Sequence, residues 1–165
     1  FAVVLPDDMV MSDRPCIGQL IEAWNDVGGN VVAVENVPAD QTDKYGILDV
    51  QGQQGNLFSA KGLVEKPAVG TAPSTMAIIG RYVLDPLVMD ELGRTKPGSG
   101  GEIQLTDAMN ATIGKVPFHG LQFDGERFDC GDKVGFLKAN IRFALERPNM
   151  RDKVASLIKD IAATL

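Results

Sequence analysis

The stretch FAVVLPDDMV, residues 1–10, decides the fold class because it joins an apolar run to a proline and two acids. Residues 2–5 are apolar and rich in valine, which predicts a buried strand too short for a helix. Pro6 lacks the N–H that a sheet ladder needs, so pairing should end there. Asp7 and Asp8 then follow the carboxyl end of a core strand, where ligands bind in open α/β sheets. An ordinary solvated turn that caps a helix is the alternative for these two acids.

A helix and a second strand are predicted directly after this stretch. Ser12 or Asp13 can cap a helix that carries Pro15 in its first turn and ends at Gly28. The sequence VVAVENV at residues 31–37 is typical of a strand. A strand–helix–strand unit indicates an α/β protein with parallel strands. The helix positions expected to face the core are Ile17, Leu20, Ile21 and Trp24.

The remaining pattern predicts an α/β fold with a mixed sheet flanked by helices. Two strands joined by the turn GQQG at residues 52–55 form a predicted hairpin. The expected strands span residues 44–50, 56–67, 75–84 and 115–123, and the expected helices span residues 86–93, 102–113 and 133–147, with a final amphipathic helix after residue 148.

Composition limits the function classes that need consideration. The chain has 165 residues, 44% of them apolar and 23% charged, which suits one globular domain. A net charge of −6 argues against a broad positively charged surface that binds nucleic acid or an anionic membrane. No apolar stretch reaches the length of a membrane span. Cys16 and Cys130 match no metal motif, so we expect buried free thiols and a cytoplasmic location.

Two stretches carry carboxylates that could share a metal ion. Asp129 of RFDCGD ends a predicted strand, as Asp7 does, so the two carboxylates could meet over one sheet. Mg²⁺ prefers one or two carboxylates, with water and substrate phosphate in its other positions. The only histidine, His119, is expected to be structural or exposed rather than a general base.

Two further stretches place polar groups near loop ends. Glu65 and Lys66 of VEKP are neighbours at a strand end, where they could reach one ligand from two sides or form an exposed tip. The glycine-rich stretch at residues 97–108, PGSGGEIQLTDA, leads into a helix N-terminus that could bind an anion. It matches no phosphate-loop motif, and a flexible linker is its simpler interpretation.

Six stretches together resemble the sugar-phosphate nucleotidylyltransferases. The stretches LPDD, KYGILD, VEKP, AIIGRYVL, GGEIQLTDA and RFDCGD stand in the same order in that family, and the resemblance runs from Phe1 to about Arg147. It implies a Rossmann-like nucleotide-diphospho-sugar transferase fold. The combination of GEIQLTDA with FDCG favours the uridylyl-transferring members over the glucose-1-phosphate thymidylyltransferases, which remain an alternative.

The resemblance implies a role for several residues. Asp7 and Asp129 resemble the family's metal-binding carboxylates for Mg²⁺, and Lys66 resembles the cation that holds the sugar phosphate. These three are the candidate catalytic residues. The other residues implied to bind substrate are Asp8, Gly46, Glu65 and Gly80. For Asp8 the alternative is that it only supports Asp7. Glu65 would accept hydrogen bonds from the hexose, Gly46 and Gly80 would act through their backbone, and the role of Glu102 stays open.

The implied reaction makes UDP-glucose and pyrophosphate from UTP and glucose 1-phosphate. Positioning and charge neutralisation carry such a transfer, so no side-chain nucleophile is needed. The family's glycine-rich nucleotide loop has no counterpart in these 165 residues, and Phe1 leads straight into a strand. We therefore expect the C-terminal part of a longer enzyme, inactive alone, or a non-catalytic sugar-phosphate-binding fragment.

The resemblance also implies a domain organisation. Residues 1–147 would form the sugar-phosphate- and metal-binding part of a nucleotidyltransferase domain, and residues 148–165 would form a C-terminal amphipathic helix. The substrates would be small molecules, with no nucleic acid or membrane partner. We expect the full-length form to be a homo-oligomer.

Overall fold

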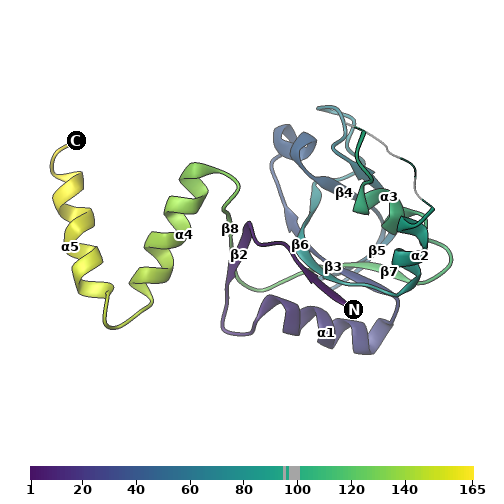
Figure 1. The fold of residues 1–165 in the computed structure, drawn as a ribbon, viewed down its shortest axis with the longest axis horizontal. Coiled ribbons are helices and arrows are strands. Elements are labelled where there is room, and N and C mark those ends of the chain that lie inside the picture. The colour runs from purple at the N-terminus through teal and green to yellow at the C-terminus, as the bar shows by residue number, and fades with distance from the viewer. Residues whose placement is uncertain (95, 97–100) are drawn as a thin grey trace. The chain divides into compact units, whose positions relative to one another are not determined.

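The chain contains both strands and helices, and a computed structural model describes residues 1–94, 96 and 101–165 (Figure 1). The strands are β1 (Ala2–Val4), β2 (Asp8–Met11), β3 (Asn30–Asn36), β4 (Gly46–Gln54), β5 (Leu57–Glu65), β6 (Met76–Val83), β7 (Phe118–Gln122) and β8 (Glu126–Asp129). The helices are α1 (Cys16–Val27), α2 (Leu87–Leu92), α3 (Leu105–Asn110), α4 (Lys133–Leu145) and α5 (Arg151–Ala162), with a 3-10 helix η1 (Ala39–Lys44). The α/β class is confirmed.

One six-stranded sheet has the order β1-β6-β3-β7-β5-β4. Strands β3 and β7 pair in parallel, and the other neighbours pair antiparallel, so the predicted mixed sheet is confirmed. The predicted hairpin is β4 with β5. Strand β4 continues through Gly52 to Gln54, beyond its predicted end at residue 50, whereas β5 ends at Glu65, two residues before its predicted end. Strand β4 also pairs with β6, where Ile47 faces Ala77.

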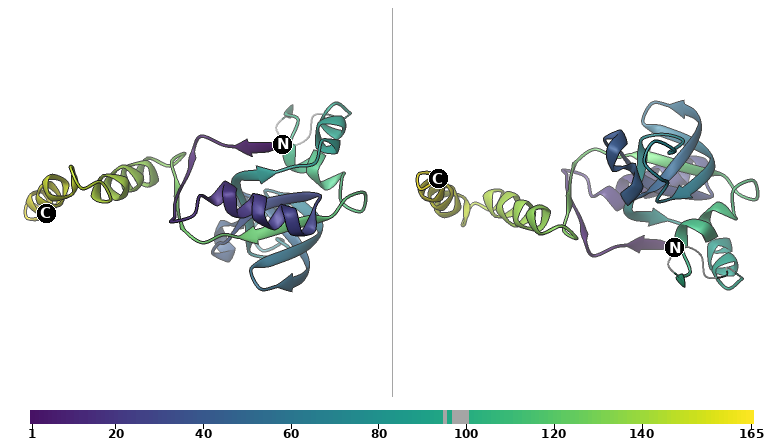
Figure 2. Two further views of the ribbon diagram at one scale, coloured as in Figure 1. Left: turned by 90° about the horizontal axis from the view of Figure 1, so that it is seen from below. Right: turned by 90° about the horizontal axis from the view of Figure 1, so that it is seen from above.

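Strand β3 lies at the centre of the core. Residues 31–34 are fully buried, because helices cover both faces of the sheet at this strand. Helix α1 packs on β3 and β6, whereas Val32 and Val34 share a cluster with Val88 of α2 and Ala108 of α3. In Figures 1 and 2, α1 runs along one side of the sheet and α3 lies on the other.

Strand β1 differs from its prediction. It pairs only with β6 among the described strands and therefore lies at the edge of the sheet. Val4 is 54% exposed and Leu5 is 38% exposed, so the expected fully buried core strand is wrong in this chain. The expected end of pairing at Pro6 is confirmed, because β1 ends at Val4.

The segment between β1 and α1 also differs from its prediction. Residues 8–11 form β2, because they pair antiparallel with β8. Helix α1 starts only at Cys16, with Pro15 at its N-cap and no side-chain cap, so capping by Ser12 or Asp13 is wrong. Gly28 ends the helix as predicted.

The buried face of α1 is rotated from the expected one. Leu20 is fully buried, but Ile21 and Trp24 are 44% and 40% exposed. Gln19 is buried instead, because its amide donates to the carbonyls of Arg14 and Asp124 and accepts from the Asp124 N–H. The amide thus ties the start of α1 to the end of the β7 segment.

The contacts divide the chain into two compact units. Unit 1 comprises residues 1–5 and 14–124, and unit 2 comprises residues 6–13 and 125–165. Unit 2 contains the β2–β8 ribbon with α4 and α5, and Phe128 of β8 is buried against Phe143 of α4, with 5.7 Å between ring centroids. The boundary at residue 147 stays a prediction. Among the described residues, no helix has both the length and the apolarity needed to cross a membrane.

Candidate functional site

The two predicted metal carboxylates, Asp7 and Asp129, meet in unit 2. Asp129 ends β8 and faces Asp8 in the ribbon register, and the Cys130 N–H donates to the Asp7 carbonyl at 2.7 Å. Asp7 immediately precedes β2, so pairing of β2 with β8 fixes both residues at the same end of the ribbon. The sheet over which the two residues meet is the two-stranded β2–β8 ribbon, and Asp7 precedes β2 instead of following a core strand.

The carboxylates of Asp7 and Asp129 both lie next to Gly131. A Cβ built on Gly131 would lie 3.2 Å from Asp129 Oδ1 and 3.8 Å from Asp7 Oδ2. Asp129 stays 43% exposed at its side chain, and its Oδ1 accepts from the Gly131 N–H at 3.0 Å. Two hard oxygen donors that solvent can reach suit Mg²⁺, which fills its other positions with water and phosphate. No cluster of three or more metal-ligating side chains occurs in residues 1–94, 96 and 101–165.

Arg127 is a site residue that the sequence interpretation missed. Its Nε donates to Asp8 Oδ1, and its Nη2 lies 3.4 Å from Asp129 Oδ2. The side chains of Arg127 and Asp8 are only 8% and 10% exposed. Asp8 therefore faces a buried cation, and a contact with sugar stays a prediction. Strand alternation in RFD places Arg127 on the same face as Asp129, and that signal could have found it.

A second group of predicted residues meets in unit 1, at the open end of the β4–β5 hairpin. Gly46 pairs with Glu65 across the hairpin. The Thr106 hydroxyl on α3 donates to Glu65 Oε2 at 2.6 Å. A Cβ on Gly46 would lie 3.1 Å from that oxygen and 3.2 Å from the Thr106 hydroxyl. Thr106 lies within the stretch GGEIQLTDA, but the sequence alone gave it no role.

Lys66 has an unusual backbone. Its φ of 43° is the only positive value at a non-glycine residue in the described part of the chain. Neighbouring side chains on a regular strand point to opposite faces, but the positive φ of Lys66 breaks this alternation after Glu65. As a result Lys66 Nζ lies 3.8 Å from Glu65 Oε1 while its side chain stays 62% exposed. Such backbone outliers cluster at functional sites.

Gly80 lies on β6, buried, near the irregular part of the sheet. The β3–β6 register shifts between Val32 and Val34, which pair with Tyr82 and Ile78 on either side of Gly80. Its carbonyl accepts from the Leu5 N–H at 2.9 Å and from Arg81 Nη1 at 2.8 Å. Bulges of this kind occur next to active sites.

The glycine-rich stretch at residues 97–108 lies only partly within the described part of the chain. Residues 95 and 97–100 lie outside the described part of the chain. Helix α3 spans only Leu105–Asn110, so the predicted helix over residues 102–113 is too long at both ends. Glu102 is exposed and precedes α3, and its role stays open.

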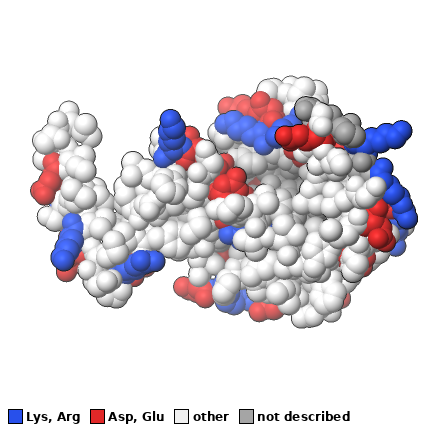
Figure 3. Space-filling view, viewed as in Figure 1, with Lys and Arg blue, Asp and Glu red and all other residues white. Residues whose placement is uncertain are grey.

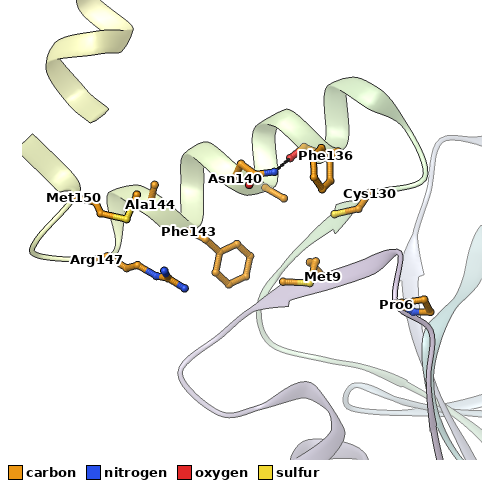
Figure 4. A pocket seen from close by; sticks show the side chains of 10 residues that line it. Pro6, Met9, Cys130, Phe136, Asn140, Phe143, Ala144, Arg147 and Met150 are labelled. Carbon is orange, nitrogen blue, oxygen red and sulfur yellow. Dashed lines mark hydrogen bonds between the residues drawn. The ribbon is translucent and has the colours of Figure 1, made fainter. Parts of the chain in front are cut away.

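Unit 2 also contains an apolar cavity of about 340 Å³. Figure 4 shows Met9, Phe136 and Phe143 around it, with Cys130 at one side. Cys130 is half-buried, so the predicted burial fails there, whereas Cys16 in unit 1 is buried as expected. Burial raises the pKa of the Cys16 thiol to about 11.

Charged side chains of both signs lie beside each other on the face drawn in Figure 3. Unit 1 contains the ion pairs of Lys61 with Asp49 at 3.5 Å and of Lys115 with Glu91 at 2.9 Å. Neighbouring Lys115 and Arg94 lower the pKa of Glu91.

The fold and the two groups of residues define a class of protein. The sequence profile of the nucleotidyl transferase family matches residues 1–144, and the chain belongs to this family. The family that the six ordered stretches indicate is thereby confirmed.

Individual relatives show which members of this family the chain resembles. The chain is 56% identical over 138 residues to a UTP–glucose-1-phosphate uridylyltransferase of Komagataeibacter xylinus, covering 84% of this chain and 49% of the relative. It is 44% identical over 161 residues to the enzyme of the same name from Staphylococcus haemolyticus, covering 98% and 56%. A crystal structure of UDP-glucose pyrophosphorylase complexed with UDP-glucose has a TM-score of 0.84 and 36% identity, covering 89% and 57%. The chain thus spans about half the length of these relatives.

Proposed function

We propose that this chain carries the sugar-phosphate site and the metal carboxylates of a uridylyltransferase that makes UDP-glucose. The observation that supports this most is the gathering of Gly46, Glu65 and Lys66 at one end of the β4–β5 hairpin. The relatives named UTP–glucose-1-phosphate uridylyltransferase supply the substrates of the proposal.

Each of these three residues has a distinct proposed role. Glu65 is 17% exposed at its side chain, so its carboxylate can accept hydrogen bonds from hexose hydroxyls at the surface of the sheet. Gly46 leaves room for the sugar to approach the backbone, because it places no side chain beside Glu65. The exposed ammonium of Lys66 holds the phosphate of glucose 1-phosphate as a point charge.

The reaction is an in-line transfer. A phosphate oxygen of glucose 1-phosphate forms a bond to the α-phosphorus of UTP, while the bond from that phosphorus to the bridging oxygen breaks and pyrophosphate leaves with its electron pair. The attacking oxygen is already anionic near pH 7, so no general base is needed. Catalysis then rests on positioning and on neutralising two polyanions.

Asp7 and Asp129 are the residues that would hold Mg²⁺. When bound, this ion neutralises phosphate charge and supplies Lewis acidity. Arg127 and the Gly131 N–H bind different oxygens of Asp129 and so fix the orientation of its carboxylate. Asp7 is held through its backbone carbonyl, which leaves its carboxylate free to turn toward an ion.

The proposal also includes what the chain does by itself. These 165 residues contain no counterpart of the family's glycine-rich nucleotide loop, so we expect them to bind glucose 1-phosphate but not to turn over UTP. The homo-oligomeric state and the cytoplasmic location stay predictions.

Pyrophosphate release from UTP and glucose 1-phosphate tests the function in the product of the complete reading frame that encodes these residues. We expect Mg²⁺-dependent release, faster with UTP than with dTTP, and none from the 165 residues alone. Asp129→Asn should lower kcat by about 100-fold or more, because it removes a metal charge. Asp132→Asn is the matched control. Asp132 caps α4 through the Gly135 N–H, and asparagine caps equally well. Equal activity of the two variants would rule out the metal site.

A further inference from the structure

Thr106 contacts the carboxylate of Glu65, which is proposed to bind the hydroxyl groups of the sugar. Its hydroxyl donates to Glu65 Oε2 at 2.6 Å, a distance typical of a strong hydrogen bond to a charged acceptor. The other carboxylate oxygen, Oε1, lies 3.8 Å from Lys66 Nζ. Glu65 is therefore held between a hydroxyl on α3 and the neighbouring ammonium.

Helix α3 is fixed to β5 at two points, which gives this hydroxyl a defined position. Asn110 Oδ1 accepts from the Leu63 N–H at 2.9 Å, one helical turn beyond Thr106. Four residues of helix rise about 6 Å. Two residues of strand rise about 6.6 Å. The pairs Thr106–Glu65 and Asn110–Leu63 therefore match in spacing when helix and strand run in opposite directions.

The contact has a consequence for Lys66. An exposed lysine–carboxylate pair gains little free energy in water, so a competing hydrogen bond to the carboxylate can keep the two groups apart. The Thr106 hydroxyl keeps Oε2 turned toward α3, so the Glu65–Lys66 pair stays loose at 3.8 Å. Lys66 is then available to a phosphate, and Glu65 keeps lone pairs for hydroxyl donors.

We infer that Thr106 is a positioning residue that orients the Glu65 carboxylate toward the hexose and prevents a closer ion pair between Glu65 and Lys66. The inference rests on the proposed function. It adds a residue that acts through Glu65 and need not touch the substrate. It also assigns sugar discrimination to the junction of α3 with β5, because a misdirected carboxylate distinguishes hydroxyl orientations poorly.

The experiment compares Thr106→Val with Thr106→Ser in the product of the complete reading frame. Valine keeps the shape and removes the hydroxyl, whereas serine keeps the hydroxyl. For Thr106→Val we expect KM for glucose 1-phosphate to rise at least about tenfold. KM for UTP should stay within about twofold, and the preference for glucose 1-phosphate over galactose 1-phosphate should fall. Thr106→Ser should restore both.

The possible outcomes separate this inference from the proposed function. If the unmodified protein releases no pyrophosphate, the proposed function fails first. If it is active and Thr106→Val changes KM for both substrates equally, or leaves sugar preference intact, the positioning role is wrong. Thermal denaturation of each variant shows whether a loss of activity is caused by unfolding. If Thr106→Val does not fold, Thr106→Ser tests the inference. A folded Thr106→Ser variant with a raised KM for glucose 1-phosphate would overturn it.

Discussion

Arg127 and Asp8 form an ion pair that is buried within the β2–β8 ribbon, with 8% and 10% of their side chains exposed. The register places Val10 opposite Arg127 and Asp129 opposite Asp8, so the ion pair is diagonal across the two strands. Desolvation of both charges is costly, and their mutual attraction offsets it only while both are present. The pair also orients Asp129, because the same guanidinium reaches that carboxylate.

Removing one partner of this pair should destabilise the protein more than removing both. We expect Arg127→Met to lower the free energy of unfolding by about 3–5 kcal/mol, because the buried Asp8 carboxylate loses its Arg127 guanidinium partner. The double variant Arg127→Met with Asp8→Leu should recover much of that loss. Urea denaturation of the single and double variants forms the double-mutant cycle. Additive losses would contradict the coupling.

A methyl group at Gly46 should disturb the sugar site. Its Cβ would lie 3.1 Å from Glu65 Oε2 and 3.2 Å from the Thr106 hydroxyl, closer than most Cβ contacts. We expect Gly46→Ala to raise KM for glucose 1-phosphate by about tenfold, because Glu65 must turn away. Gly62→Ala on the same hairpin is the matched control, since its nearest contact would be 3.6 Å. Equal KM values for the two variants would refute the role of Gly46.

The two cysteines should differ in reactivity. Burial raises the pKa of the Cys16 thiol to about 11, so this thiol stays protonated and unreactive at neutral pH. Cys130 is half-buried beside the cavity of unit 2 (Figure 4). A disulfide reagent in native buffer should label one thiol quickly, and Cys130→Ala should remove that fast phase. Loss of the fast phase in Cys16→Ala instead would contradict this assignment.

Sequence patterns predicted the fold well where local signals were strong. Residues 31–37 have a long β-branched run, and β3 lies within one residue of that range. The short β2 was missed because residues 8–11 carry no strong strand signal and are held by pairing with distant β8. The carboxylates were visible through motif resemblance. Strand alternation in RFD could have pointed to Arg127, but its pairing with Asp8 on a distant strand could not be read from the sequence. Thr106 had no local signal, because its role depends on a contact with Glu65, far away in sequence.

His119 should make stability fall on acidification. Its Nδ1 is buried with no hydrogen-bond partner among the described residues, and burial lowers its pKa below 6.5. The unfolded chain therefore binds more protons than the folded chain in mildly acidic solution. The stabilisation from the neutral imidazole is present above pH 6.5 and is lost as the pH falls through the lower folded pKa. Urea midpoints against pH should fall more steeply for the unmodified protein than for His119→Leu. Parallel curves would exclude His119 as the cause.

The Asn110 side chain should hold α3 on the β5 edge. Strand β5 pairs with β7 only over residues 57–59, so the Leu63 N–H relies on Asn110 Oδ1. We expect Asn110→Ala to cost about 1 kcal/mol of stability, because it leaves that donor without its partner. Hydrogen exchange should show faster exchange at the Leu63 amide, and Asn110→Asp, which keeps an acceptor oxygen, should retain most of its protection. Because the same helix carries Thr106, Asn110→Ala should also raise KM for glucose 1-phosphate, but less than Thr106→Val does. Unchanged exchange at Leu63 in Asn110→Ala would mean that core packing of Ala108 and Met109 alone docks the helix.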